Sequence, residues 1–437
     1  LASAVIHPAV RRGESRLRLC ATAAHSTADI RHALTAFAAL AGRVSASATT
    51  APERRARSGL RVVEHIDEIE PAEWDAVVPL HEVQGTHAFV KACQDARVGD
   101  AVFRHVVHYT SGRVSGVASF TLMPVRIDLL CPGPLRTIIG TVRRAWHGFL
   151  QPSILICGLP VSAGRPCFFH AREHGEEFAR AAASYMGALG SELDASILCF
   201  KEFSPAESRP LESALREAGY FHANSLPTYR LPLGWSSFGE YQSSMRSSYR
   251  HQIASTLRAR EADGIAVCRV RGADTDWSRV FALYEQVMDR AEFQLERLSL
   301  SFFQRLAEGL GERVETLLLE RDGELLAAAI LLNAARRCTF FMTGIDYAAN
   351  LRFGSYIALV TDVVAYAIES GATVLDLGQT SDHLKSRLGA AAEPRSIFFR
   401  CRRPLTHDLF RRAAPFLFPA PTTPPRRIFR GNGAHRP

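Results

Sequence analysis

Lysine is scarce in this chain, so each lysine is a candidate for a specific role. Only three occur, Lys91, Lys201 and Lys385, against 49 arginines. Lys385 follows shortly after an aspartate in the segment LDLGQTSDHLKSRLG. A fixed ammonium there could stabilise a carbonyl oxygen as it becomes negative, or hold a substrate phosphate. The alternative is a solvated charge on a helix surface.

Asp376 lies in the apolar run TVLDLG, where an unpaired carboxylate would be costly. We therefore expect it to have a partner or a shifted pKa. It could orient or deprotonate an amine, or it could cap the next turn. His383 and Tyr356 are further acid–base candidates, although Tyr356 could equally face the core.

Arg352, Gly354 and Ser355 directly precede a long apolar run and are the candidates for binding phosphate. The first N–H groups of a helix lack partners within the helix, and the helix dipole attracts anions there. Arg352 would add a positive charge. Simple capping of the helix by a turn is the alternative.

A basic helix is predicted over 245–260, MRSSYRHQIASTLRAR, from the apolar spacing of its sequence. Arg246 and Arg250 are four residues apart and would share one face of it. They could bind an anionic donor or acceptor, or they could be part of a solvated face.

The run HAREH at 170–174 has the H-x-x-E-H pattern of some zinc peptidases. That pattern needs a helix, whereas His170 ends an apolar run and Gly175 follows at once, so a strand-to-helix turn is predicted and no metal site is expected. No Walker-type phosphate loop, G-x-S-x-G or G-x-G-x-x-G occurs either. Nucleotide hydrolysis, serine hydrolysis and dinucleotide redox chemistry therefore have no support.

The net charge of +8 is concentrated at the two ends of the chain. Residues 1–59 carry +6 and residues 400–437 carry +8, so the body between them is at −6. An acidic body offers nucleic acid no broad basic face. The nine cysteines contain no C-x-x-C pair, which favours reduced thiols and a cytoplasmic protein.

The chain ends are expected to lack structure. Residues 1–59 are Ala- and Arg-rich without a secretory apolar core, and 416–437 are Pro- and Arg-rich. Both are predicted to pack on nothing. The longest apolar stretch, 325–332, is far shorter than the ~20 residues that a membrane span needs.

The body reads as strands alternating with helices in two similar halves, which predicts an α/β class. Residues 105–123 and 315–333 each show two apolar runs around Ser-Gly or Asp-Gly, a strong hairpin signal. Each hairpin precedes a strand, a helix and a short strand with an Asp: 166–170, 176–189 and 194–200, then 338–344, 355–370 and 373–378. The second half opens with a strand at 265–270 and helices at 277–290 and 299–310.

This order of elements resembles the GNAT acyltransferase fold, and its doubling resembles the FemAB-like superfamily, which includes aminoacyltransferases of peptidoglycan cross-bridges. The resemblance rests on three stretches: 245–260, 344–370, and 375–389, whose ending is similar to the family's D-x-G, short gap, K-x-x-x-G. It covers 60–400, and 236–400 most firmly. The sequence departs from the family in LDLG, which lacks an aromatic residue after Asp376, and in Arg352-Phe353-Gly354-Ser355, where a Gly-rich or Pro-Gly turn is commoner.

The resemblance implies two tandem GNAT-like domains that act as an N-acyltransferase. Domains are expected at 60–235 and 236–404, with extensions at 1–59 and 405–437. Acyl-CoA is the favoured co-substrate, with no tightly bound cofactor, and the acceptor would be a small-molecule or cell-wall-precursor amine. An aminoacyl-tRNA donor is the first alternative. The second is a GNAT-like protein that binds a ligand without catalysis.

Overall fold

The computed structural model describes residues 2–5, 16–19, 59–125, 152–161, 164–165, 167–291, 296–380, 382–420 and 426–430. The chain divides into two units, 1–56 and 57–437. In the first, β1 (Ala2–Val5) pairs antiparallel with β2 (Arg16–Leu19). These two strands depart from the predicted lack of structure in 1–59, and the rest of that segment up to residue 58 lies outside the described residues.

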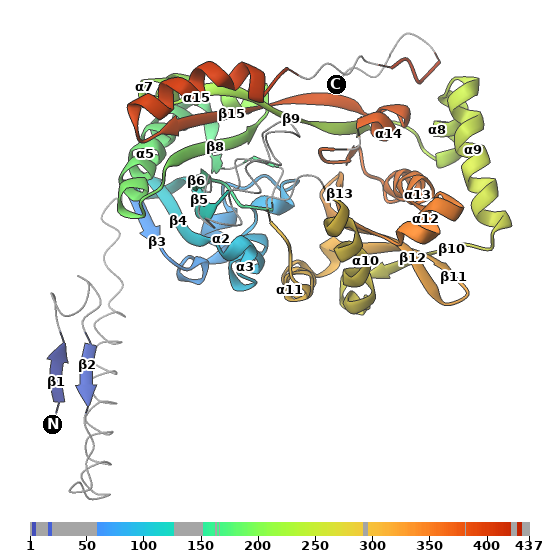
Figure 1. The fold of residues 1–437 in the computed structure, drawn as a ribbon, viewed down its shortest axis with the longest axis horizontal. Helices are drawn as coiled ribbons and strands as arrows, with labels where there is room; N and C mark the ends of the chain where they lie inside the picture. Colours follow the sequence, from blue (N-terminus) through green and yellow to red (C-terminus); the bar gives the residue numbers. More distant parts are fainter. Residues whose placement is uncertain are drawn as a thin grey trace, which may run out of the picture. The chain divides into compact units, whose positions relative to one another are not determined.

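The second unit is built on one mixed sheet that runs through both halves (Figure 1). Its strand order is β10-β11-β12-β13-β14-β9-β15-β8-β6-β5-β4-β3, with β7 also pairing with β5. Helices pack against the sheet in each half, so the predicted α/β class is confirmed.

The first half contains the predicted hairpin, but the strand that pairs with both the hairpin and the later strand 197–203 is at 153–157, which was not predicted, and not at 166–170. Ser111 and Gly112, both at positive φ, turn the chain between two long strands, the backbone that a two-residue hairpin turn requires. The strands are β3 (Gly59–Val63), β4 (Val102–Thr110), β5 (Arg113–Pro124), β6 (Ser153–Cys157), β7 (Cys167–Phe169) and β8 (Ile197–Phe203). The helices are α2 (Pro71–Asp75), α3 (His87–Asp95), α5 (Ala171–Glu192), α6 (Pro205–Ser208) and α7 (Glu212–Glu217).

The second half repeats this order from its own opening strand. Asp322 and Gly323 form the second hairpin turn, again at positive φ. The strands are β10 (Ala266–Arg271), β11 (Val314–Arg321), β12 (Glu324–Ala334), β13 (Arg337–Ile345) and β14 (Val374–Asp376). The helices are α8 (Phe238–Ser244), α9 (Ser247–Ala262), α10 (Trp277–Arg290), α11 (Leu300–Leu310), α12 (Tyr347–Phe353), α13 (Ser355–Glu369) and α14 (Asp382–Arg387).

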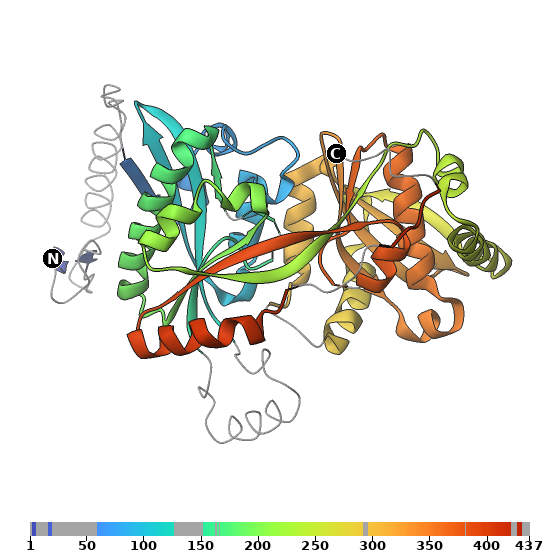
Figure 2. The ribbon, with the colours of Figure 1, turned by 90° about the horizontal axis from the view of Figure 1, so that it is seen from above.

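Two long strands join the halves. β9 (Phe221–Pro232) pairs with β14 at its end, and β15 (Ala391–Cys401) lies between β9 and β8. Figure 2 shows both strands crossing from one half to the other. The last strand of the chain thus completes the first half of the sheet, an exchange that the sequence repeat gives no sign of. The domain boundaries drawn from the sequence stay a prediction.

The core of the second half is organised around α13, which is apolar on most of its surface. Leu359, Val363 and Val364 are fully buried in it. On α9, Ile253 is buried and Tyr249 and Leu257 pack against the same cluster, so the apolar spacing of the predicted basic helix is real. In the described parts of the chain, no helix by itself has the length and apolarity to cross a membrane; α12 and α13 reach that threshold only jointly, across an 83° bend.

The C-terminal segment packs on the body, so the prediction that 416–437 packs on nothing is wrong. α15 (Pro404–Leu417) lies against β15 and β9 (Figure 1). Further on, Ile428 is buried, and the ring of Phe429 lies 4.9 Å from that of Trp235. The Arg246 N–H donates to the Ile428 carbonyl over 2.8 Å. The prediction relied on the Pro- and Arg-rich composition and overlooked these large apolar side chains, whose burial stabilises the contact.

A candidate active site between two diverging strands

The candidate site opens where β13 and β14 separate. The two strands are parallel and pair only through Arg337–Thr339 and Val374–Asp376. Beyond Asp376 the chain stays with β9, because the Leu377 N–H donates to the Tyr229 carbonyl. β13 continues alone on that side to Ile345. The backbone N–H and C=O groups along that edge therefore face a gap and not a neighbouring strand.

A cavity of about 290 Å³ fills this gap. Its walls come from both halves: residues 81–84 of the first, and β13, α10, the turn after β14, α13 and α14 of the second. Three of the candidate catalytic side chains line it together: Tyr356, Asp376 and Lys385. The position between the two halves and the mixed apolar and polar walls are typical of a small-molecule site.

Lys385 is buried, so the alternative of a solvated helix charge is wrong. Lys385 is only 3% exposed, and its ammonium group donates to the Gln379 carbonyl. Burial lowers the pKa of Lys385 to about 8, and the charges of Asp376 and Asp382 only partly oppose this. Most molecules therefore carry a positive Lys385 at pH 7, and the group is poised to exchange a proton near neutrality.

Asp376 has the partner that its apolar strand requires. Its Oδ2 accepts from Arg230 Nε at 2.9 Å, and its Oδ1 accepts from the Gly378 N–H at 2.9 Å. Arg230 stands directly opposite Asp376 in the β9–β14 register. The expected partner is thus Arg230, and the carboxylate also caps the turn after β14, as one of the two interpretations required. A role toward an amine stays a prediction.

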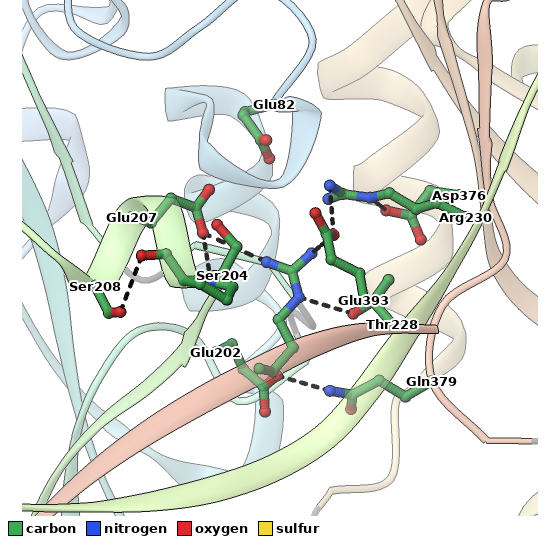
Figure 3. Close-up of polar contacts among 12 residues, drawn as sticks. Glu82, Glu202, Ser204, Glu207, Ser208, Thr228, Arg230, Asp376, Gln379 and Glu393 are labelled. Carbon is green, nitrogen blue, oxygen red and sulfur yellow. Dashed lines mark hydrogen bonds and ion pairs between the residues drawn. The ribbon is translucent and has the colours of Figure 1, made fainter. Parts of the chain in front are cut away.

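Gln379 ties that turn to the first half of the molecule. Its side-chain amide donates to Glu202 Oε2 at 2.7 Å and to the Leu226 carbonyl at 2.8 Å. Glu202 is buried on β8, and burial raises its pKa. Figure 3 shows the bond from Gln379 to Glu202. Because the Gln379 carbonyl also accepts from the Lys385 ammonium, Gln379 links the position of Lys385 to the first half.

A buried arginine organises the charges behind the site. Arg395 on β15 donates to Thr228 Oγ1 at 3.1 Å, Glu207 Oε2 at 3.4 Å and Glu393 Oε2 at 2.9 Å. Glu393 in turn lies 2.7 Å from Arg230 Nη1. Figure 3 shows the contacts that lead from Glu393 through Arg230 to Asp376. A planar guanidinium suits such multiple bonding, and the network fixes Asp376 from behind.

The first half contributes a second ion pair to the cavity wall. Glu82 accepts from Arg337 Nη1 at 2.8 Å. Burial alone would raise the pKa of Glu82, but hydrogen bonding to His81 and the charge of Arg337 outweigh it and lower the pKa to about 2. The neighbouring Gln84 Oε1 is buried and has no hydrogen-bond donor among the described residues. A buried acceptor normally has a partner, so this oxygen is a candidate contact for a bound molecule.

The predicted phosphate site at the start of α13 is capped from within the chain. Asn350 accepts from the Gly354 N–H through its carbonyl and from the Tyr356 N–H through its side chain, both at 2.9 Å. Gly354 is at φ 61°, the left-handed turn that ends α12, and Ser355 is buried. The guanidinium of Arg352 lies 4.7 Å from the ring centre of Phe353. Phosphate binding here stays a prediction.

The remaining sequence candidates lie away from the cavity. His383 is exposed on α14, and Arg246 precedes α9 as its exposed cap; neither these nor Arg250 line the cavity. At the H-x-x-E-H run, His170 is extended (φ −75°, ψ 134°) and marks the predicted strand-to-helix turn, but α5 begins at Ala171, so Gly175 lies inside the helix and does not delay its start to 176 as predicted. Over the described residues, no group of three or more His, Cys, Asp or Glu is arranged to hold a metal.

Several residues of the site escaped the sequence analysis, chiefly Arg230, Gln379, Arg395 and Glu82. For Arg230 the signal was present: it is a lone charge in the apolar run TYRLPL, as Asp376 is in its own strand. Pairing two opposite charges lowers the free-energy cost of burying each of them. Gln379 and Glu82 lie in polar loops, where nothing in the local pattern separates a site residue from a solvated one.

Comparisons with known proteins agree with this architecture. Residues 247–386 match the family model described as acetyltransferase (GNAT) domain. The structure of FemX aligns with a TM-score of 0.52 at 14% identity, covering 80% of this chain and 100% of FemX. No curated protein sequence matches the chain. The second half thus matches a GNAT domain model, and the predicted tandem GNAT-like fold is confirmed.

Two further structures align less closely. The C-terminal domain of a putative lysylphosphatidylglycerol synthetase from Agrobacterium fabrum aligns with a TM-score of 0.47 at 13% identity, covering 77% of this chain and 92% of that domain. A tandem GNAT protein from the clavulanic acid biosynthesis pathway aligns with a TM-score of 0.46 at 11% identity, covering 79% and 99%.

Proposed function

We propose that this chain, whose residues 247–386 form an acetyltransferase-type GNAT domain, transfers an acyl group from acyl-CoA to an amine. One observation carries the proposal: the gap between β13 and β14 leads to a buried Lys385 beside an ion-paired Asp376. Acyl transfer to an amine needs the donor positioned, its carbonyl oxygen stabilised and a proton removed from the nitrogen. The site has a group for each task.

Lys385 stabilises the oxyanion in this mechanism. The amine attacks the thioester carbonyl, the new C–N bond forms, and negative charge develops on the oxygen. An ammonium that is buried and already held by the Gln379 carbonyl meets that charge without reorganisation. The C–S bond then breaks, and the proton lost by the amine ends on the sulfur of CoA.

In this mechanism Asp376 orients the attacking nitrogen, and Tyr356 supplies a proton to the leaving group. Asp376, fixed by Arg230, accepts a hydrogen bond from the incoming amine and orients its lone pair. Tyr356 lines the same cavity from the first turn of α13, on the side from which the donor enters. Its hydroxyl donates a proton to the leaving sulfur, and the proton that the amine loses restores the hydroxyl, so that the net transfer is from nitrogen to sulfur.

The donor lies along the free edge of β13. The extended arm of CoA carries amide groups that can pair with unpartnered backbone groups between Phe340 and Ile345, as a neighbouring strand would. Its diphosphate then reaches the start of α13, where two guanidinium groups, Arg321 and Arg352, lie 5.0 and 4.7 Å from the ring centre of Phe353. Asn350 gives up the α13 N–H groups to the phosphate.

The acceptor reaches the cavity from the side of the first half. The acceptor of Gln84 and the carboxylate of Glu82 stand in this wall, so a primary amine with a further N–H or O–H donor fits it. At about 290 Å³ the cavity holds the reacting end of the acceptor and no more. The amine can therefore belong to a small metabolite or protrude from a larger cell-wall precursor.

Ligand-dependent melting of the full chain tests the donor. Acetyl-CoA and longer acyl-CoAs at millimolar concentration should raise the melting temperature in proportion to the logarithm of their concentration, and Arg352→Ala should weaken this shift. Release of free CoA with a panel of amines then identifies the acceptor. If no acyl-CoA shifts melting while aminoacyl-tRNA binds, the donor assignment is wrong. If acyl-CoA binds but no amine releases CoA, a binding protein without catalysis is the better description.

A further inference from the structure

α15 is apolar on two opposite faces, and only one of them is covered by the rest of the protein. On the covered face, Phe410 packs against Phe221 and Phe399, with ring centres 5.5 and 5.1 Å apart, and Ala414 is buried beside them. Figures 1 and 2 show α15 on the outside of the first half, against β9 and β15. This face accounts for why the helix docks on the sheet.

The opposite face carries three large apolar side chains in the open. Leu405 and Phe416 are each 87% exposed, and Leu409 is 70% exposed. Positions 405, 409, 412 and 416 are spaced by four, three and four residues, so these side chains and Arg412 form one stripe along the helix. We call Leu405, Leu409, Arg412 and Phe416 the outer stripe. Three large apolar side chains exposed along one face of a helix mark an interaction site more often than single exposed residues do.

The charges around the outer stripe indicate that its partner is negatively charged. Residues 400–437 carry nine arginines and one acid, Asp408. Asp408 is already taken up by Arg411 at 3.1 Å. Arg403 and Arg412 are exposed, and the described residues offer them no carboxylate. An exposed apolar stripe flanked by free arginines matches a surface that is apolar inside and negative outside.

We propose that the outer stripe docks this protein on an anionic lipid surface, with α15 lying in the plane of the membrane. Leu405, Leu409 and Phe416 enter the boundary between headgroups and acyl chains, and the arginines meet lipid phosphates. The acidic body, at −6, is repelled and stays above the surface. A second copy of the chain fits less well, because a twofold contact through this stripe would bring Arg412 and its flanking arginines against their own counterparts.

This inference is independent of the acyl-transfer chemistry, and it implies that acceptors at a membrane surface come within reach of the enzyme. Its test uses the full chain and vesicles of equal parts phosphatidylcholine and phosphatidylglycerol, with pure phosphatidylcholine as reference. The wild type should sediment with the mixed vesicles and far less with the neutral ones. The triple variant L405Q/L409Q/F416Q should lower partitioning into the mixed vesicles about tenfold or more. Glutamine preserves helix propensity, so the fold should persist.

The matched control removes equally exposed leucines elsewhere. Leu80 and Leu351 are 83% and 89% exposed, and L80Q/L351Q should bind vesicles as the wild type does. If the triple variant also binds as the wild type does, the basic ends of the chain bind lipid by charge alone and the proposal fails. Failure of the wild type to bind, or equal binding to both vesicle types, overturns it as well.

A fluorescent reporter separates lipid from other partners of the stripe. In Phe416→Trp, the new indole should emit at long wavelength in solution and shift to shorter wavelength only when mixed vesicles are added. An emission that is already blue-shifted without lipid would show that a second copy or another segment of this chain covers the stripe. That result overturns the membrane assignment even if the vesicles bind.

Discussion

The two halves of the molecule each contain a pair of parallel strands at the same place in the fold, and the two pairs differ in the space beyond their last paired residues. In the first half β6 pairs with β8 through Ile154–Cys157 and Ile197–Phe200, and the cavity next to the end of β6 measures about 10 Å³. In the second half β13 and β14 pair over a shorter stretch and then diverge around a cavity of about 290 Å³. The same arrangement of strands is thus closely packed in the first half and borders the candidate site in the second.

Aromatic side chains make the difference in the first half. A side chain added at Gly85 would meet Phe168 at 2.2 Å, and one added at Gly116 would meet Phe178 at 2.4 Å. Both rings therefore rest directly on backbone, and Phe168 lines what remains of the cavity in this half. In the second half the corresponding space is bordered by Lys385 and Asp376. The first half is thus closely packed at the position where the second half has the candidate site.

The largest effect should come from opening the packed half. Phe168→Ala should lower the free energy of unfolding by about 3–5 kcal/mol, because a buried ring leaves a cavity. Phe341→Ala, at the wall of the open site, should cost about 1–2 kcal/mol, since that ring is only partly buried. Urea denaturation of both variants measures this contrast. Equal losses would mean that the second half is packed as tightly as the first.

Removing the charge of Lys385 should damage catalysis. Lys385→Met keeps the length of the side chain, and kcat and kcat/KM should fall together by roughly tenfold to a thousandfold, the scale of one lost electrostatic contact in the transition state. Lys91→Met, on the surface of the first half, should leave both constants unchanged. A rise in KM for the donor at constant kcat would instead assign Lys385 to ground-state binding. Wild-type kinetics would remove it from the mechanism.

Stability and activity should respond oppositely to pH. The pKa of Lys385 is about 8 in the folded protein against 10.5 for the ordinary side chain. Between these values the unfolded chain binds more protons, so stability from this group rises with pH, by up to about 3 kcal/mol. Below pH 8 the cost of burying the charge is fully present. Urea titrations between pH 7 and 10 should show this slope in the wild type and lose it in Lys385→Met.

Activity should fall over the same range, because the oxyanion needs the protonated amine. If kcat stays constant from pH 7 to 10 with the chemical step rate-limiting, the charge of Lys385 does not act in the transition state. A stability slope that persists in Lys385→Met would assign the titration to another group.

The smallest of these effects concerns the link between the halves. Gln379→Ala removes the bonds to Glu202 and Leu226 and should lower kcat about threefold to tenfold through looser placement of Lys385, at an unchanged KM for the donor. Gln94→Ala is the matched control, since Gln94 makes similar bridging bonds within the first half. If both variants lose activity equally, general destabilisation accounts for the loss.

The sequence predicted most of the fold because its signals are local. The hairpin pairs Ser111-Gly112 and Asp322-Gly323 and the apolar runs around them depend on neighbouring residues alone, and the structure has both turns. Helix α10 was predicted at 277–290, its observed span. The prediction for the C-terminal segment was wrong, because Phe429 packs against rings that are distant in the chain.

In the site, too, only the residues with a local signal could be predicted. Lys385 and Asp376 could be singled out from the sequence because one is a rare residue and the other a charge in an apolar strand. The residues around them could not be singled out. Arg230, Gln379 and Arg395 belong to the site only through contacts with residues that are more than a hundred positions away in the chain. The burial that lowers the pKa of Lys385, and the divergence of β13 from β14 that opens the cavity, are properties of the assembled sheet. Desolvation and strand register depend on distant parts of the chain, and only the tertiary structure brings those parts together.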